Sequence, residues 1–170
     1  MIKAVHLREV ITLTLKELAD LAKKPKIYSK AAVELLMLTA AQESHGGKYL
    51  KQDDNNPKTL FDGPALGIYQ IEPTTAADLF TNYLAFKADL LGAQITFATS
   101  INEGNWRQNM MGNIPYQTVM ARLQYYRKPG SLPEYTDIDG LAKYYKVHWN
   151  THLGKATVEE AIKNYWRFGK

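Results

Sequence analysis

The chain has 170 residues, 45% of them hydrophobic and 22% charged, and it carries a formal net charge of +4 at pH 7. This length and mixture predict one globular domain, 1–170, with a core of its own. The absence of cysteine excludes disulfides, thiol nucleophiles and cysteine-bearing zinc sites. The sequence has no run of 18 or more apolar residues, so it predicts no membrane-spanning helix.

The N-terminal segment 1–20 mixes charged with apolar positions, which is typical of an amphipathic helix rather than of a signal peptide. We therefore expect no ordinary export signal and no stable membrane insertion. The basic charge suits an anionic polymer such as nucleic acid, teichoic acid or peptidoglycan. It is also typical of a soluble protein, because the lysines and arginines are spread along the chain.

Helical periodicity dominates the start of the chain. A recurring apolar face predicts a helix over 6–24, which stops before Pro25. Ser29 is a suitable N-cap for a helix over 30–43 that is nearly apolar throughout, so we expect this helix at the centre of the fold. The pair Gly46-Gly47 gives its C-terminal exit.

The next segment is less regular. Asp, Asn, Pro and Gly over 51–64 indicate a loop or a short irregular β-hairpin, and 66–71 is an apolar stretch of strand length. Pro73 starts a helix that runs to about Phe80. A further helix is predicted over 83–100, with four apolar residues facing inward: Leu84, Ala88, Leu91 and Ile95.

The rest of the chain predicts three more helices. Glycines and asparagines over 102–114 indicate a loop, a helix follows over 115–126, and 129–133 is a turn-rich break. Asp137 is a candidate cap for a helix over 141–149 that ends before Gly154, and Thr157 with Glu160 fits a capping box at the start of the last helix. The predicted fold is mostly α, or α+β with a minor β element.

Glu43 is the strongest candidate for chemistry. It ends the apolar run 31–42 and opens the polar turn Ser44-His45-Gly46-Gly47. A carboxyl group held against apolar surface has its charged form disfavoured, so its pKa rises. An acid that keeps its proton near neutral pH is able to protonate a leaving-group oxygen, as glycosidases require.

A second pattern begins twenty residues after Glu43, at Gly63, and includes Gly67-Ile68-Tyr69-Gln70 and Gln70-Ile71-Glu72-Pro73-Thr74-Thr75. Together with Glu43-Ser44, it resembles the lysozyme-like superfamily, particularly goose-type lysozymes and soluble lytic transglycosylases. Those proteins carry a catalytic glutamate followed by serine at a helix end, and later a Gly-Leu-Met-Gln run. Here Ile68 stands for the leucine and Tyr69 for the methionine. The segment 120–126 resembles the later helix that supplies a tyrosine in transglycosylases.

The resemblance implies a compact helical domain with a substrate groove and Glu43 as the catalytic acid. Six residues are candidates for substrate binding: Ser44, Gly67, Tyr69, Gln70, Tyr125 and Tyr126. The usual Tyr-Asn-Ala-Gly is absent, because Arg127-Lys128-Pro129-Gly130 follows, so the choice between Tyr125 and Tyr126 stays open. Each candidate also has a structural interpretation, such as a turn hydrogen bond or core packing.

A second carboxylate would decide the mechanism, since a hydrolase normally uses one as base or nucleophile. The candidates are Glu72, Asp62 and the pair Asp53-Asp54. Goose-type lysozymes carry an acid at the place of Glu72, which favours hydrolysis. Transglycosylases do not, and there a single glutamate lets the substrate's own 6-hydroxyl attack. Glu72 is equally interpretable as a favourable charge at a helix N-terminus.

The expected function is cleavage of the β-1,4 bond between N-acetylmuramic acid and N-acetylglucosamine in bacterial peptidoglycan. The alternatives are a lytic transglycosylase that forms 1,6-anhydro ends, and an inactive glycan-binding or virion structural module. We expect no cofactor and a monomer. The resemblance and the absence of a signal suit a phage endolysin, held in the host cytoplasm before release to the periplasm or cell wall, or a virion-associated enzyme.

Two other interpretations are weaker. His148 and His152 share a helix face, as zinc ligands do, but Trp149 replaces the glutamate of a metallopeptidase motif and no third ligand is evident, so we expect no metal. Basic and aromatic residues near the C-terminus are of the types that bind nucleic acid, but no nucleic-acid motif is present and an amphipathic terminal helix explains them better.

Overall fold

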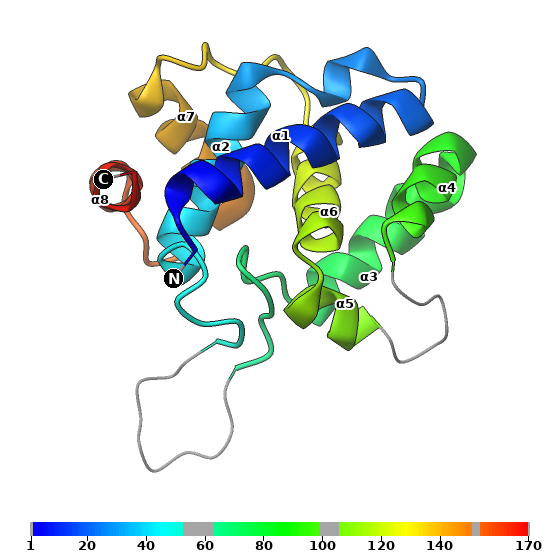
Figure 1. Cartoon of the computed structure of the whole chain (residues 1–170), viewed down its shortest axis with the longest axis horizontal. Helices are drawn as coiled ribbons and strands as arrows, with labels where there is room; N and C mark the ends of the chain where they lie inside the picture. Colours follow the sequence, from blue (N-terminus) through cyan, green and yellow to red (C-terminus); the bar gives the residue numbers. More distant parts are fainter. Residues whose placement is uncertain (1, 53–62, 99–105, 151–153, 170) are drawn as a thin grey trace.

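The computed structural model describes residues 2–52, 63–98, 106–150 and 154–169. Most of these residues are helical (Figure 1). The α-helices are α1 (Ala4–Leu21), α2 (Lys30–Ser44), α3 (Pro73–Asn82), α4 (Ala88–Thr96), α5 (Trp106–Gly112), α6 (Ile114–Tyr126), α7 (Ile138–Tyr145) and α8 (Val158–Phe168). Shorter turns are η1 (Pro25–Ile27), η2 (Leu84–Phe86) and the π-helical η3 (Lys146–Asn150).

Helix α2 lies at the centre, as its apolar sequence predicted. Side chains on nearly all sides of it are buried, and α1, α6, α7 and α8 pack around it. Ser29 is the N-cap, and its Oγ accepts a hydrogen bond from the Ala32 amide at 3.0 Å. In Figure 1, α1 crosses α2, while α3, α4 and α5 lie on the side of α6 that faces away from α8.

The end of α2 is a left-handed turn. The helix ends at Ser44, and His45 already has a positive φ of 50°, followed by Gly46 at 68° and Gly47 at 80°. Gly46 also lies close to the C-terminal helix, because a Cβ atom there would stand 2.0 Å from the Phe168 ring. The glycine pair therefore forms the exit, although His45 takes the first left-handed position.

The minor β element consists of two isolated antiparallel bridges within the described residues, Lys51 with Leu66 and Leu66 with Ile71. The apolar stretch 66–71 is consequently a tight turn rather than a strand. Its amides at both ends pair across the turn, Leu66 N with Ile71 O and Ile71 N with Leu66 O. Residues 53–62 of the predicted loop lie outside the described residues.

Three sequence expectations for the second half were wrong. The predicted helix over 83–100 is instead η2 and α4, and its inward residues are Leu84, Leu90 and Ala93, while Ala88 and Ile95 are exposed. Part of the predicted loop, 102–114, is the short helix α5. The helix expected over 141–149 begins earlier, at Ile138, and changes to a π-helical turn after Tyr145.

The local capping predictions were right. Asp137 accepts a hydrogen bond from the Gly140 amide at the start of α7. Thr157 and Glu160 form both hydrogen bonds of a capping box at the start of α8. These caps fix where the two C-terminal helices begin, and both helices pack on α2.

Candidate functional site

Glu43 lies in the last turn of α2 and is partly buried. Its Oε1 accepts a hydrogen bond of 2.6 Å from the hydroxyl of Tyr145, the last residue of α7. The Tyr145 side chain is fully buried. Burial and the Glu43 carboxylate raise the pKa of Tyr145 well above its ordinary value, so the phenol remains protonated and acts as the donor.

Burial raises the pKa of Glu43 from 4.5 to about 7, and the hydrogen bond from Tyr145 opposes this effect only in part. Among the described residues, no charged side chain forms an ion pair with it. A carboxyl with a pKa of about 7 is about half protonated at neutral pH. It can therefore donate a proton to a substrate oxygen and then take one back.

A second glutamate on α2 shows what a structural carboxylate looks like in this fold. Glu34 pairs with Arg8 through two hydrogen bonds of 2.9 and 3.1 Å, and the Tyr165 hydroxyl donates to it at 2.7 Å. These contacts join α1, α2 and α8. Glu43 also meets a tyrosine but has no cation beside it in the described part of the chain, which is why burial dominates its pKa.

The turn Gly67–Gln70 is held between α2 and α6. The Ser44 hydroxyl donates to Ile68 O at 2.8 Å, and the Ile68 amide donates to Oε1 of Gln117 at 2.8 Å. The hydroxyls of Tyr69 and Thr118 are hydrogen-bonded at 3.1 Å. The residue next to Glu43 thus bonds directly to this turn, so the two predicted motifs lie side by side.

Three candidates for substrate binding in these motifs are buried, and their contacts lie within the protein. Ser44 and Tyr69 are fully buried, and their hydroxyls are used within the protein. Burial also raises the pKa of Tyr69 well above its ordinary value. Gly67 has a φ of 78°, and a Cβ there would stand 2.5 Å from Met110 O and 2.6 Å from Oε1 of Gln117. The close approach that requires glycine is therefore to α5 and α6, not to a sugar.

Gln70 and Glu72 are more accessible. Gln70 is partly buried, adopts a positive φ of 48° and donates from Nε2 to Gly67 O at 2.7 Å. Glu72 is exposed at the N-cap of α3 without capping it, and Thr74 donates to its carboxylate at 3.4 Å. Glu72 forms no contact with Glu43 in the described structure, which fits its interpretation as a helix-end charge. Asp62, Asp53 and Asp54 lie outside the described residues.

The tyrosine that meets the acid is neither of the two candidates. Tyr125 is buried in the core, with its hydroxyl 2.8 Å from that of Thr39 and its ring 5.0 Å from Trp149. Tyr126 is partly buried, and the Arg122 guanidinium lies 5.1 Å from its ring centre. Tyr145 takes the place beside Glu43.

The sequence did contain a signal for Tyr145. An apolar stripe at helical spacing runs along α7 and ends at this residue: Ile138, Leu141, Ala142, Tyr145. A tyrosine on such a stripe is buried and its hydroxyl needs a hydrogen-bond partner. What the sequence did not contain was the identity of that partner, 102 residues away in the chain.

The two weaker interpretations gain little from the structure. The ring of His148 packs at a tilt of 51° against that of Tyr144, with 4.3 Å between ring centres, and His152 lies outside the described residues. No group of three or more His, Cys, Asp or Glu in the described ranges is arranged to hold a metal ion. Two of the aromatic residues near the C-terminus have contacts within the protein. Trp149 packs on Tyr125, and the Tyr165 hydroxyl donates a hydrogen bond to Glu34.

None of the helices in the described ranges has the length and apolar character needed to cross a bilayer. No protein-family model, no curated protein and no solved structure matches this chain.

Proposed function

We propose that this chain cleaves the β-1,4 bond between N-acetylmuramic acid and N-acetylglucosamine in bacterial peptidoglycan, with Glu43 as general acid. The observation that carries the proposal is a carboxyl group whose pKa is raised to about 7 by burial, at the end of an apolar helix and beside a structured turn. Most surface glutamates are ionised at neutral pH and have no proton to give.

The hydrogen bond from Tyr145 orients this acid. The Tyr145 hydroxyl donates to Oε1, which acts as an acceptor, so the proton of the neutral carboxyl group resides on Oε2. When Glu43 transfers that proton to the bridging oxygen, the bond to the anomeric carbon breaks and the sugar ring gains oxocarbenium character. The Tyr145 hydroxyl then stabilises the carboxylate that Glu43 has become, because a hydrogen bond to an ionised acceptor is stronger.

Hydrolysis needs a water molecule, which Glu72 or Asp62 would position. A lytic transglycosylase is the second candidate, and one observation favours it: a carboxyl group with a pKa of about 7 can both give and take a proton, so Glu43 alone can serve first as acid and then as base. In that reaction the Glu43 carboxylate takes the proton from the substrate's 6-hydroxyl, whose oxygen attacks the anomeric carbon and closes a 1,6-anhydro ring. Both reactions use the same first step.

The setting is part of the proposal. The proposed protein is a monomeric phage endolysin or virion-associated wall enzyme. The net charge of +4 supports this setting, because it favours approach to an anionic cell wall.

The test is digestion of purified sacculi, followed by turbidity and by mass spectrometry of the products. Wild-type protein should clear the suspension, and E43Q should be about 10² to 10⁴ times slower. E9Q, which changes an exposed glutamate on α1, is the matched control and should retain full activity. If wild type and E43Q clear equally, or if neither does, the proposal is wrong, and the second result favours an inactive glycan-binding or structural module.

The products separate the two candidates. Reducing muramic acid ends indicate hydrolysis, whereas anhydro ends, lighter by one water molecule, indicate a transglycosylase. E72Q adds a further arm. A loss of activity comparable to that of E43Q would assign Glu72 the role of base, and full activity would remove it from the mechanism.

A further inference from the structure

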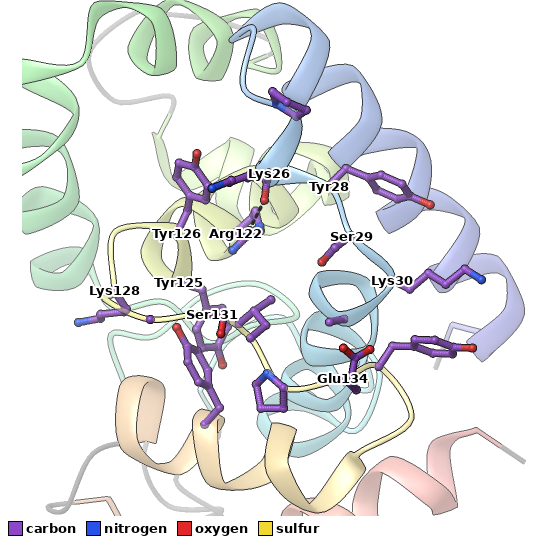
Figure 2. A pocket seen from close by; sticks show the side chains of 17 residues that line it. Lys26, Tyr28, Ser29, Lys30, Arg122, Tyr125, Tyr126, Lys128, Ser131 and Glu134 are labelled. Atoms are coloured by element: carbon purple, nitrogen blue, oxygen red, sulfur yellow. Dashed lines mark hydrogen bonds between the residues drawn. The ribbon is translucent and has the colours of Figure 1, made fainter.

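A cavity of about 620 Å³ lies at the opposite end of α2 from Glu43. The start of α2, the end of α6, the connection to α7 and Tyr144 surround it (Figure 2). Ser29 caps α2 and Glu43 is in its last turn, so about 21 Å of helix separate the cavity from the proposed acid. Of the candidate residues described above, Tyr125 and Tyr126 also line the cavity, whereas Glu43 and the turn Gly67–Gln70 do not.

The charged residues around the cavity are mostly cations. Lys26, Lys30, Arg122 and Lys128 line it, and Glu134 is the one carboxylate among its lining residues. None of these four cations forms an ion pair within the part of the chain that the structure describes, whereas three cations elsewhere do: Arg8, Lys24 and Arg127. In Figure 2, Tyr126 and Lys128 lie on one side and Tyr28 and Lys30 on the other, with Arg122 and Ser29 between them.

Arg122 is the central residue of this cluster. Its side chain is only 4% exposed, and it donates from Nε to Ile27 O at 2.7 Å and from Nη2 to Lys26 O at 3.1 Å. Both acceptors are neutral carbonyls. Burial lowers the pKa of Arg122 to about 10, since no carboxylate compensates the charge. A buried guanidinium without a counter-charge is costly, and an anion bound in the cavity would offset that cost.

The N-terminus of α2 adds donors to the same cavity. The Val33 amide makes the first intrahelical bond, to Ser29 O, so the amides of Lys30 and Ala31 precede the helical ladder. Oγ of Ser29 accepts from the Ala32 amide, which leaves its hydroxyl proton free to donate. Helix dipole, amides and hydroxyl all favour negative charge at this end.

We propose that this cavity binds a phosphate ester, with the phosphate between Arg122 and the N-terminus of α2. An anionic tetrahedral group with two free oxygens, as in a phosphodiester, or three, as in a monoester, suits donors that approach from several directions. The cavity is far larger than inorganic phosphate and lies within the range of small-molecule sites, so the organic part has room against the tyrosine walls. A small soluble ester and a phosphate-bearing polymer such as teichoic acid share this chemistry.

The test is titration of the whole ¹⁵N-labelled protein with glycerol 3-phosphate, followed by amide shifts. Shifts should concentrate at 29–32 and at the Nε–H of Arg122. The variant K26Q/K30Q/K128Q should weaken binding at least about tenfold. The control K3Q/K87Q/K163Q removes the same charge from exposed positions outside the cavity and should bind as wild type does. R122Q is a further variant, interpreted only if its spectrum shows a folded protein.

Three results would overturn the proposal: no saturable binding at low salt, shifts spread over the surface, or equal weakening in both triple variants. A second titration with poly(glycerol phosphate) distinguishes the sources. Tighter binding per phosphate in the polymer identifies a polymer ligand, and binding of the monomer alone identifies a small ester. E43Q should bind both probes normally, so this proposal stands or fails independently of the proposed glycosidase activity.

Discussion

Tyr145 donates its phenolic proton to Oε1 of Glu43 across 2.6 Å, which connects the end of α7 to the end of α2. This hydrogen bond lowers the pKa of Glu43 while burial raises it, and burial is the larger effect. The proposed activity depends on that balance, because it leaves a proton on the carboxyl group near neutral pH.

Removing the Tyr145 hydroxyl should change the pH profile of wall cleavage. In the wild type, kcat/KM should fall above pH of about 7, where the acid loses its proton. In Y145F the hydrogen bond that favours the carboxylate is lost, so the fall in kcat/KM should move to higher pH. The lost orientation should also lower kcat by about 10- to 100-fold.

Y144F is the control for this experiment, since Tyr144 is the neighbouring residue on α7 and is only partly buried. It should keep the wild-type profile. A Y145F variant that has lost activity, but whose kcat/KM falls at the same pH as that of the wild type, would indicate a purely structural role for Tyr145.

Replacing Glu43 should alter the pH dependence of stability. The folded pKa is raised from 4.5 to about 7, so this group's contribution is fully present below about pH 4.5 and is lost as pH rises through about 7. Relative to E43Q, wild-type protein should lose about 3 kcal/mol of unfolding free energy between pH 4 and pH 8. Urea denaturation at both pH values measures this difference, and parallel behaviour of the two proteins would contradict the raised pKa.

Ser44 should be important for stability and not for substrate affinity. S44A leaves the buried Ile68 carbonyl and the Gly47 amide without their partner, and should cost about 1–3 kcal/mol. The control S131A changes an exposed serine and should stay within about 0.5 kcal/mol of wild type. Thermal unfolding gives the stability, and KM gives the affinity. A large rise in KM with unchanged stability would restore Ser44 as a substrate ligand.

Gly67 should tolerate no side chain. G67A must accommodate a Cβ 2.5 Å from the Met110 carbonyl in a left-handed conformation, and we expect a loss of about 2–4 kcal/mol. Gly92 in α4 is the matched control, because a Cβ there meets nothing within 4 Å. G92A should stabilise the protein by about 0.5–1 kcal/mol. Equal stability of the two variants, compared by thermal unfolding, would mean that the turn does not require glycine.

The parts of the fold that were predictable depend on interactions close in the sequence. The apolar run of α2, its cap at Ser29 and the capping box of α8 involve residues three or four positions apart. The parts of the fold that were predicted wrongly depend on contacts between residues far apart in the sequence. Ile95 faces solvent while Leu90 is buried, because the position of η2 rotates α4 relative to a continuous helix.

The candidate site was predictable to a similar extent. The apolar helix around Glu43 is local, so its raised pKa could be predicted from the sequence. Its tyrosine partner comes from a helix 102 residues later and could not be. The buried roles of Ser44 and Tyr69 likewise depend on Ile68 and on Thr118 of α6, which lie close only after folding.

The role of Glu43 as general acid is tested by a ¹³C NMR titration of its carboxyl carbon, assigned by comparison with E43Q. We expect a midpoint at a pH of about 7. A midpoint near the ordinary value of 4.5 would contradict this role, because Glu43 would then hold no proton at neutral pH and could not act as the general acid.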